Sequence, residues 1–291
     1  MSFKPGTKKI VIIVVFCIIS NCIGVDNPSL LNEDVKYQSC QLFNNTRDFN
    51  EKETYDNRIF VVGHAYGAVS GNNRGMSDNL IDFFSKIEIN EKTFLILTGD
   101  LVRDNTLANL EKVKEQIELY FNKYYVVPGN HEMIESNNFY NVFEVDFFHE
   151  ELTSSHIIGA NFNHPNWLPT KEDQNKINSI IQESPKNNII LFSHQIFWFK
   201  LFEDEIRPNG FQLFDNSLEA PSLNWINNSK ESLFVISGDS GAWNQEFFCK
   251  SNNEKVTLIS NGIGGFKEDV ILEIIDTKDG IFFKKIEINN P

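Results

Sequence analysis

The residues of this sequence best suited to chemistry lie in short polar turns that directly follow apolar runs. Carboxylate, imidazole and amide groups occur there together, and these are the donors that hydrolytic Mn, Fe or Zn sites use. Three of the six histidines, at positions 64, 131 and 194, lie in such turns, so a shared site explains the pattern better than unrelated turns do. The turns are Gly63-His64, Gly99-Asp100, Gly129-Asn130-His131, Ser193-His194 and Gly238-Asp239.

The apolar runs before these turns have the length and composition of buried β-strands. They cover residues 59–62, 93–97, 124–127, 189–192 and 233–236. Ser77 can cap an amphipathic helix after the first strand, Asn105 and Thr106 both offer caps for one after the second, and a third helix is expected near residues 171–183. This β-α-β-α-β order predicts a mostly parallel sheet with right-handed crossovers, whose strand ends converge on one crevice. The stretch around residues 132–165 is less regular, and residues 256–288 are typical of antiparallel strands.

The order of the turns resembles a known family. It is similar to the motif order of the calcineurin-like metallophosphoesterases. The matching segments are the strand from Arg58 to Gly63, Gly99-Asp100, Gly129-Asn130-His131-Glu132 and the single His194. The resemblance covers about residues 58–290, and the run GNHE after a strand is its most specific element. It implies an α/β fold, a four-layer α/β/β/α metallophosphoesterase-like sandwich, with a two-metal centre at the strand ends.

The resemblance also implies metal ligands. Asp100 matches the ligand that bridges the two ions, Asn130 the amide ligand and His194 an imidazole ligand. Asp239 stands where the family has the first histidine of its last motif, and a carboxylate can still bind a hard or borderline ion.

Other positions depart from the family pattern. His64 replaces an aspartate and Tyr66 a histidine in the first motif, and Gly241 replaces the second histidine of the last one. An imidazole is a good ligand in place of a carboxylate, and Tyr66 could bind as a phenolate or only donate a hydrogen bond, whereas Gly241 has no side chain to offer. We therefore expect one well-formed metal site, and a second that is weak, altered or absent.

Three further residues are candidates for the chemistry. By resemblance, His131 is the general acid that protonates the leaving oxygen, and Glu132 could orient it. Arg103 could neutralise phosphate charge, although a solvated arginine at a helix entry is an equally good interpretation.

The bulk properties limit the partners. With 291 residues, the chain is long enough for one large α/β domain. A formal net charge of −14 argues against nucleic acid held by charge, but not against a phosphorylated small-molecule, lipid or cell-envelope substrate, because a metal reverses the local sign. The oligomeric state is left open.

The N-terminus is typical of an exported protein. Lys4, Lys8 and Lys9 precede the apolar run of residues 10–19, which is shorter than the about 20 residues of a membrane span. We expect a signal peptide or N-terminal anchor at residues 1–24, a polar extension at 25–57, and the metallophosphoesterase-like domain at 58–291. The protein would then be secreted, periplasmic, or tethered on the extracytoplasmic side of the membrane. In that oxidising environment Cys40 and Cys249 would either pair or stay as free thiols.

Two alternatives come from other functional classes. The run Gly238-Asp239-Ser240-Gly241 contains the GDSG sequence found around the nucleophile of trypsin-like proteases, which would make Ser240 a nucleophile. The altered metal motifs also allow a phosphoesterase-like module that binds a ligand without hydrolysing it.

Overall fold

The computed structural model describes residues 38–40, 42–43, 55–68, 74–164, 167–183, 186, 188–209, 232–241, 247–252, 255–265 and 269–288. The expected signal peptide or anchor at residues 1–24 lies outside them. None of the helices in the described ranges is long and apolar enough to cross a membrane. The helices are α1 (Asp78–Lys86), α2 (Leu107–Glu118), α3 (Asn130–Ile134), α4 (Ser136–Phe143), α5 (Lys171–Glu183) and the 3-10 helix η2 (Phe199–Leu201). The strands are β1 (Gln38–Ser39), β2 (Asn57–Val62), β3 (Thr93–Thr98), β4 (Tyr124–Val127), β5 (Phe147–Glu151), β6 (Ser155–Ala160), β7 (Asn188–Ser193), β8 (Ser232–Ser237), β9 (Phe248–Asn252), β10 (Val256–Ser260), β11 (Val270–Thr277) and β12 (Gly280–Glu287).

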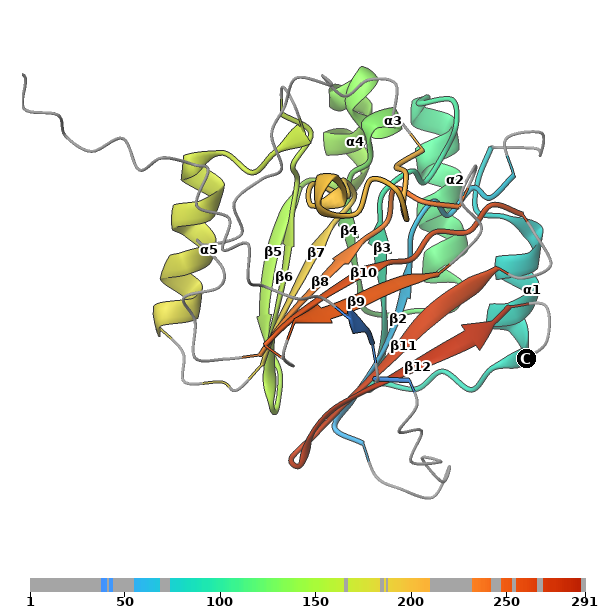
Figure 1. Cartoon of the computed structure of the whole chain (residues 1–291). Helices are drawn as coiled ribbons and strands as arrows, with labels where there is room; N and C mark the ends of the chain where they lie inside the picture. The colour runs from blue at the N-terminus through green and yellow to red at the C-terminus, as the bar shows by residue number, and fades with distance from the viewer. Residues whose placement is uncertain are drawn as a thin grey trace, which may run out of the picture. The chain divides into compact units, whose positions relative to one another are not determined.

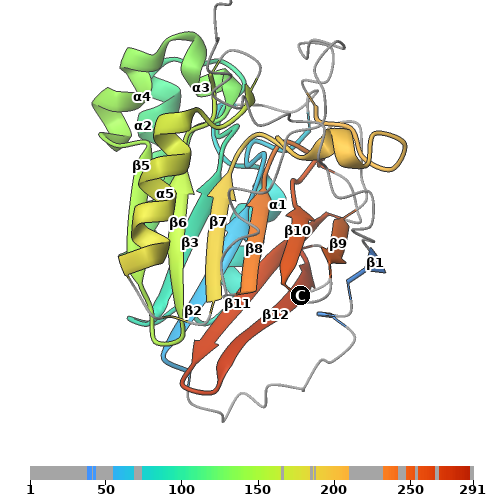
Figure 2. The ribbon, with the colours of Figure 1, turned by 60° about the vertical axis from the view of Figure 1, so that its left-hand side comes forward.

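The strands form two mixed sheets. One has seven strands in the order β1-β9-β10-β8-β7-β6-β5, and the other has five in the order β12-β11-β2-β3-β4. Strands β6, β7, β8 and β10 are parallel neighbours in the first sheet, and β2, β3 and β4 are parallel neighbours in the second. The remaining strand pairs are antiparallel: β5 with β6, β9 with β10 and with β1, and β11 with β2 and with β12. Helices α1 and α2 lie on one side of the paired sheets and α5 on the other (Figure 1). Turned by 60°, α5 lies in front of the seven-stranded sheet (Figure 2).

Alternate side chains of each inner strand enter different apolar layers. In β2, Phe60 packs in the layer that contains α1 and α2, whereas Ile59 packs between the sheets. In β7, Leu191 packs in the layer that contains α5, and Phe192 packs between the sheets. Both faces of each strand are therefore buried, which is why the strands are continuous apolar runs rather than alternating ones. The expected four-layer α/β/β/α sandwich is confirmed.

The sequence-based expectations about the individual elements are confirmed in part. The β-α-β-α-β segment forms the parallel strands β2, β3 and β4 as expected, and β7 and β8 belong to the other sheet. Residues 132–165 are not irregular, since they contain α3, α4, β5 and β6. In the C-terminal segment β11 and β12 are antiparallel as expected, but β10 pairs in parallel with β8.

A buried carboxylate connects the sheets at the end far from the polar turns. Asp276 of β11 accepts hydrogen bonds from the backbone amides of Thr153 (2.9 Å) and Ser154 (3.0 Å), which connect β5 to β6. It also accepts one from Nδ2 of Asn57 (3.1 Å), and its side chain is fully buried. Asp276 therefore links three segments that are distant in the sequence.

Replacing this carboxylate should weaken the fold without touching the polar turns. In Asp276→Asn, an NH2 group faces a backbone amide that loses its acceptor, and we expect the free energy of unfolding to fall by about 2 kcal/mol. Urea denaturation of the two proteins would measure the difference. A change below about 0.5 kcal/mol, the size usual for surface substitutions, would contradict the assigned role.

The two cysteines described by the structure are paired. Cys40, next to β1, forms a disulfide with Cys249 of β9, with Cα atoms 5.5 Å apart. The backbone amide of Cys40 also donates to the carbonyl of Cys249 at 3.3 Å. Part of the polar extension is therefore an edge strand of the seven-stranded sheet, held there covalently.

The disulfide should contribute strongly to stability because it closes a long loop. The cysteines are 209 residues apart, so Cys40→Ser should lower the free energy of unfolding by about 4 kcal/mol. The main reason is that the unfolded chain gains conformational entropy when the cross-link is removed. Urea denaturation with and without a thiol reductant would measure this. The reductant should destabilise the natural protein and leave the variant unchanged; equal stability of the two oxidised proteins would contradict the prediction.

Candidate metal centre

Two glycines allow the sheets to meet where the polar turns lie. A Cβ atom at Gly238 would be 2.1 Å from the carbonyl oxygen of Thr98, and one at Gly63 would be 2.5 Å from Cα of Gly238. A side chain at either position would push the strand ends apart, so the close approach requires glycine. The turns after β2 and β3 are thereby brought next to those after β7 and β8.

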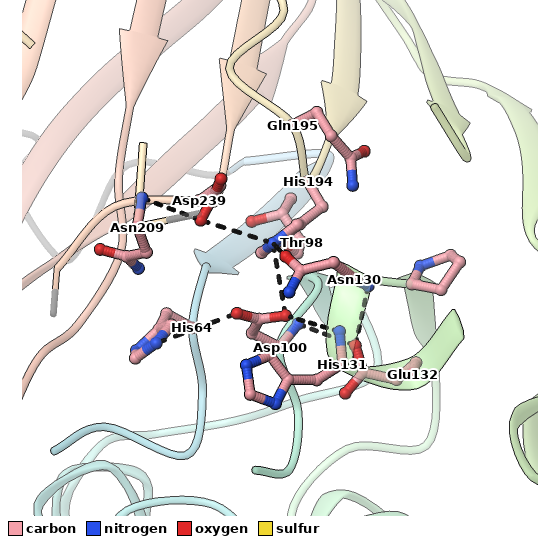
Figure 3. A network of polar contacts seen from close by, with 12 residues as sticks. His64, Thr98, Asp100, Asn130, His131, Glu132, His194, Gln195, Asn209 and Asp239 are labelled. Atoms are coloured by element: carbon pink, nitrogen blue, oxygen red, sulfur yellow. Dashed lines mark hydrogen bonds and ion pairs between the residues drawn. The ribbon is translucent and has the colours of Figure 1, made fainter. Parts of the chain in front are cut away.

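Four predicted ligands converge at this point. Asp100, His194 and Asp239 offer ligand atoms that all lie within 4.8 Å of one another, and all three side chains are buried. Nε2 of His194 lies 3.3 Å from Oδ1 of Asp100 and 3.7 Å from Oδ1 of Asp239. It lies 3.1 Å from Oδ1 of Asn130 (Figure 3). The sequence-based expectation of a shared point thus holds for residues from both sheets.

The chemistry of these four donors fits a cation. Nδ1 of His194 is 2.9 Å from the carbonyl oxygen of Thr98, which can only accept, so this nitrogen carries the proton. Burial lowers the pKa of His194, and the neutral ring then turns the Nε2 lone pair toward three oxygens. Lone pairs of one nitrogen and three oxygens face one another, an arrangement that a bound metal ion would stabilise.

Asp100 lies between two imidazoles on a strained backbone. Its Oδ1 faces His194, and its Oδ2 lies 3.9 Å from Nε2 of His64. Burial raises the pKa of Asp100, but the neighbouring His194, His131 and His64 lower it, and the net shift is downward. Asp100 and His64 have φ angles of 52° and 54°, in the left-handed region that non-glycine residues rarely adopt. Such strain is typical of functional sites.

The donors expected for a second ion are incomplete. His64 directs Nε2 toward Asp100, because its Nδ1 is 2.7 Å from the carbonyl oxygen of Ile263, and burial lowers its pKa to about 4. Tyr66 packs against it, with ring centroids 4.2 Å apart. Burial, together with the Asp100 charge, raises the pKa of Tyr66 and so disfavours the phenolate. Gly241 brings only backbone to the turn, as expected. A second ion beside His64 and Oδ2 of Asp100 would therefore have far fewer ligands than an ion beside His194.

His131 lies beside Asp100, at the edge of the donor group. Its Nδ1 is 2.7 Å from the carbonyl oxygen of Arg103, and its backbone amide donates to Oδ1 of Asp100 at 3.4 Å. Burial lowers the pKa of His131, but Asp100 and the Arg103 carbonyl raise it, and the net shift is upward. The side chain of Arg103 is exposed, and its positive charge opposes the upward pKa shifts of Tyr66 and His131, while its backbone carbonyl holds the His131 ring.

Glu132 has different partners from those expected. Its carboxylate does not orient His131 through a hydrogen bond. It accepts from the backbone amides of Gly129 (2.7 Å), Asp100 (2.9 Å) and Leu101 (2.8 Å). Burial, with the Asp100 charge, raises the pKa of Glu132 to about 7. Glu132 therefore acts on the backbone that carries the ligands.

Ser240 lacks the partner that a serine nucleophile requires. Its hydroxyl is buried and accepts a hydrogen bond from Oγ of Ser260 at 2.8 Å. Within the described residues, which include all six histidines of the chain, no hydrogen bond joins Ser240 to an imidazole. The GDSG run is instead the turn that presents Asp239.

Sequence reasoning missed the groups that orient the ligands. They are the carbonyl oxygens of Thr98 and Ile263, and the backbone amide of Asn209, which donates to Oδ1 of Asp239 at 3.2 Å. Every residue carries such backbone groups, so no residue type at these positions could have revealed them.

A family model for the calcineurin-like phosphoesterases matches residues 58–262. No curated protein matches the chain. Among solved structures, the phosphopantetheinyl hydrolase PptH from Mycobacterium tuberculosis is 13% identical over 72% of this chain and 91% of its own, with a TM-score of 0.45. Vps29 from Cryptosporidium parvum is 10% identical over 80% of this chain and 100% of its own, with a TM-score of 0.36. A single mutant of Vps29 from Entamoeba histolytica is 9% identical over 79% of this chain and 98% of its own, with a TM-score of 0.35. Because the family model matches more than half of the chain, this protein belongs to the calcineurin-like phosphoesterase family.

Proposed function

We propose that this protein is a metal-dependent phosphoesterase that holds one tightly bound divalent ion. The observation that carries the proposal is the convergence of Asp100, Asn130, His194 and Asp239 lone pairs in a member of a phosphoesterase family. Imidazole, carboxylate and amide donors suit Mn, Fe or Zn. The second position of the family's two-metal centre would be weak, because His64 and Tyr66 replace its usual ligands and Gly241 supplies none.

The residues around the donors suit hydrolysis of a phosphate ester. When bound, the ion would polarise a phosphoryl oxygen and lower the pKa of water, which supplies a nucleophile near neutral pH. A water oxygen attacks phosphorus, the bond from phosphorus to the leaving oxygen breaks, and His131 donates its proton to that oxygen. The carbonyl of Arg103 holds the His131 ring by its Nδ1, which leaves Nε2 to deliver the proton. The Arg103 guanidinium would neutralise phosphate charge.

We further propose that the protein acts outside the cytoplasm on a phosphorylated small molecule, a lipid or a cell-envelope polymer. The basic and apolar residues of the N-terminal 24 support export, either with cleavage or with retention as a membrane tether. The Cys40–Cys249 disulfide supports an oxidising compartment. The net charge of −14 is unfavourable for nucleic acid.

Metal analysis combined with a substrate panel tests this function. Purified protein should contain about one Mn, Fe or Zn ion per chain, as expected for a site with one complete donor set. It should hydrolyse 4-nitrophenyl phosphate or bis(4-nitrophenyl) phosphate, lose that activity with a chelator, and regain it with Mn²⁺ or Zn²⁺. Absence of both metal and hydrolysis with every divalent ion tried would refute the proposal.

The same experiment addresses a second candidate function. The loss of a ligand at Gly241 and the unfavourable phenolate of Tyr66 favour a module that binds a phosphorylated ligand around one ion without cleaving it. One ion per chain, with no hydrolysis of any ester in the panel, would indicate this alternative.

A further inference from the structure

The carboxylate of Glu132 connects two loops that carry predicted ligands. It lies in α3, three residues after Gly129, and its side chain is fully buried. Oε2 accepts from the amides of Gly129 and Asp100, and Oε1 accepts from that of Leu101. The first contact lies in the loop after β4, which leads directly into Asn130, and the other two lie in the loop after β3. One side chain thus holds the backbone beside two of the four donors.

The contacts on the loop after β3 act on a strained residue. Asp100 has a φ of 52°, a conformation that costs free energy unless surrounding bonds hold it. Glu132 accepts hydrogen bonds from the backbone amides of Asp100 and Leu101, which lie on either side of the Asp100 Cα atom. These two bonds therefore fix the direction of the Asp100 side chain. The backbone amide of Val102 also donates to Oε1 of Glu132 at 3.3 Å, so Glu132 binds three consecutive amides of this loop.

We propose that Glu132 is a positioning residue that sets the metal affinity of this site by orienting Asp100 and Asn130 through their backbone. This inference rests on the proposed function, since it presumes an ion at the donor group. Glu132 itself is not a ligand: both its oxygens are engaged by amides. Its role resembles that of an outer partner of a metal ligand, and the loss of such partners typically weakens metal binding about 10- to 100-fold.

A carboxylate is needed because both oxygens must accept. In Glu132→Gln one oxygen becomes an NH2 group that faces backbone N–H donors, so the hold on one loop is lost. In Glu132→Asp the side chain is one methylene shorter and cannot reach both loops equally. Both variants should therefore bind the metal more weakly, while every ligand side chain remains in place.

The test separates metal affinity from fold stability with a matched control. Asp276→Asn also converts a buried carboxylate that accepts from backbone amides, but at the opposite end of β2 from His64. The full chain, freed of metal and titrated with Mn²⁺ or Zn²⁺ by calorimetry below the melting temperature of every variant, gives the dissociation constants. We expect about a 10- to 100-fold rise for Glu132→Gln and Glu132→Asp, and less than a twofold change for Asp276→Asn.

The outcomes are distinguishable. If the natural protein binds no metal, the proposed function and this inference both fail. If it binds metal and the Glu132 variants bind it equally well, even with a lowered melting temperature, the function stands and the positioning role is refuted. Failure of both variants to fold would also refute that role, because Glu132 would then serve the fold instead.

Discussion

The Asp100→Asn variant is expected to lose its metal ion and nearly all hydrolytic activity. Oδ1 of Asp100 faces His194 and Oδ2 faces His64, so its negative charge would attract an ion at either of the two metal positions. Because loss of an outer partner alone weakens metal binding about 10- to 100-fold, loss of this ligand's charge should exceed a hundredfold. Calorimetric titration with Mn²⁺ and metal analysis after dialysis would measure it.

Asparagine is the appropriate replacement at this position. The φ of Asp100 is 52°, and asparagine tolerates the left-handed region better than alanine does. The variant therefore keeps the backbone that Glu132 holds, and the change can be assigned to the lost charge. Asp104→Asn is the matched control, because Asp104 is an exposed carboxylate four residues further along. Equal metal content in Asp100→Asn and Asp104→Asn would show that the ion lies elsewhere.

Local pattern was enough to predict the elements that position the site. The strands β2, β3, β7 and β8 are short and buried on both faces, which leaves a plain apolar signal in the sequence. Helix starts were also readable. The side chain of Ser77 accepts from the amide of Leu80, and that of Thr106 accepts from the amide of Asn109, as their residue types predict.

Strand pairing and the edge strands were not predictable in the same way. Strand β5 has the sequence FFHEE, and its partly exposed, charged edge position removes the apolar run that identifies a strand. Strand β10 pairs in parallel with β8, although no property of residues 256–260 distinguishes that partner from an antiparallel one. The division into two sheets depends on such pairings, so it came from the family resemblance and not from periodicity.

At the site, side-chain types were predictable and their orientations were not. Asp100, Asn130, His194 and Asp239 follow strands directly, which was enough to bring them to one point. The proton position of His194 is selected by a carbonyl of β3, in the other sheet, and a backbone carbonyl carries no residue-specific signal. The same reason explains why Glu132 was assigned to its neighbour His131 and not to the amides that it actually holds.

The His131→Ala variant is expected to keep its metal and lose about 10²- to 10⁴-fold in kcat, the range usual for a general acid. The hydrogen bond from His131 to Asp100 comes from its backbone amide, which alanine retains, so the donor group should stay intact. Metal content measured beside the rate would separate this variant from Asp100→Asn. His149→Ala, which removes an exposed histidine of β5, is the control and should change neither quantity.

The leaving group and the pH dependence give this prediction its sharpest test. An alkyl phosphate needs protonation of its leaving oxygen far more than a 4-nitrophenyl ester does, so the loss in His131→Ala should be larger for the alkyl ester. The net pKa of His131 is raised, so the protonated acid persists to higher pH than in a free imidazole, and the rate should fall as pH rises through that pKa. This alkaline fall should disappear in the variant. Equal losses for both esters, with the alkaline fall retained, would assign the proton to another group and leave His131 a role in binding alone.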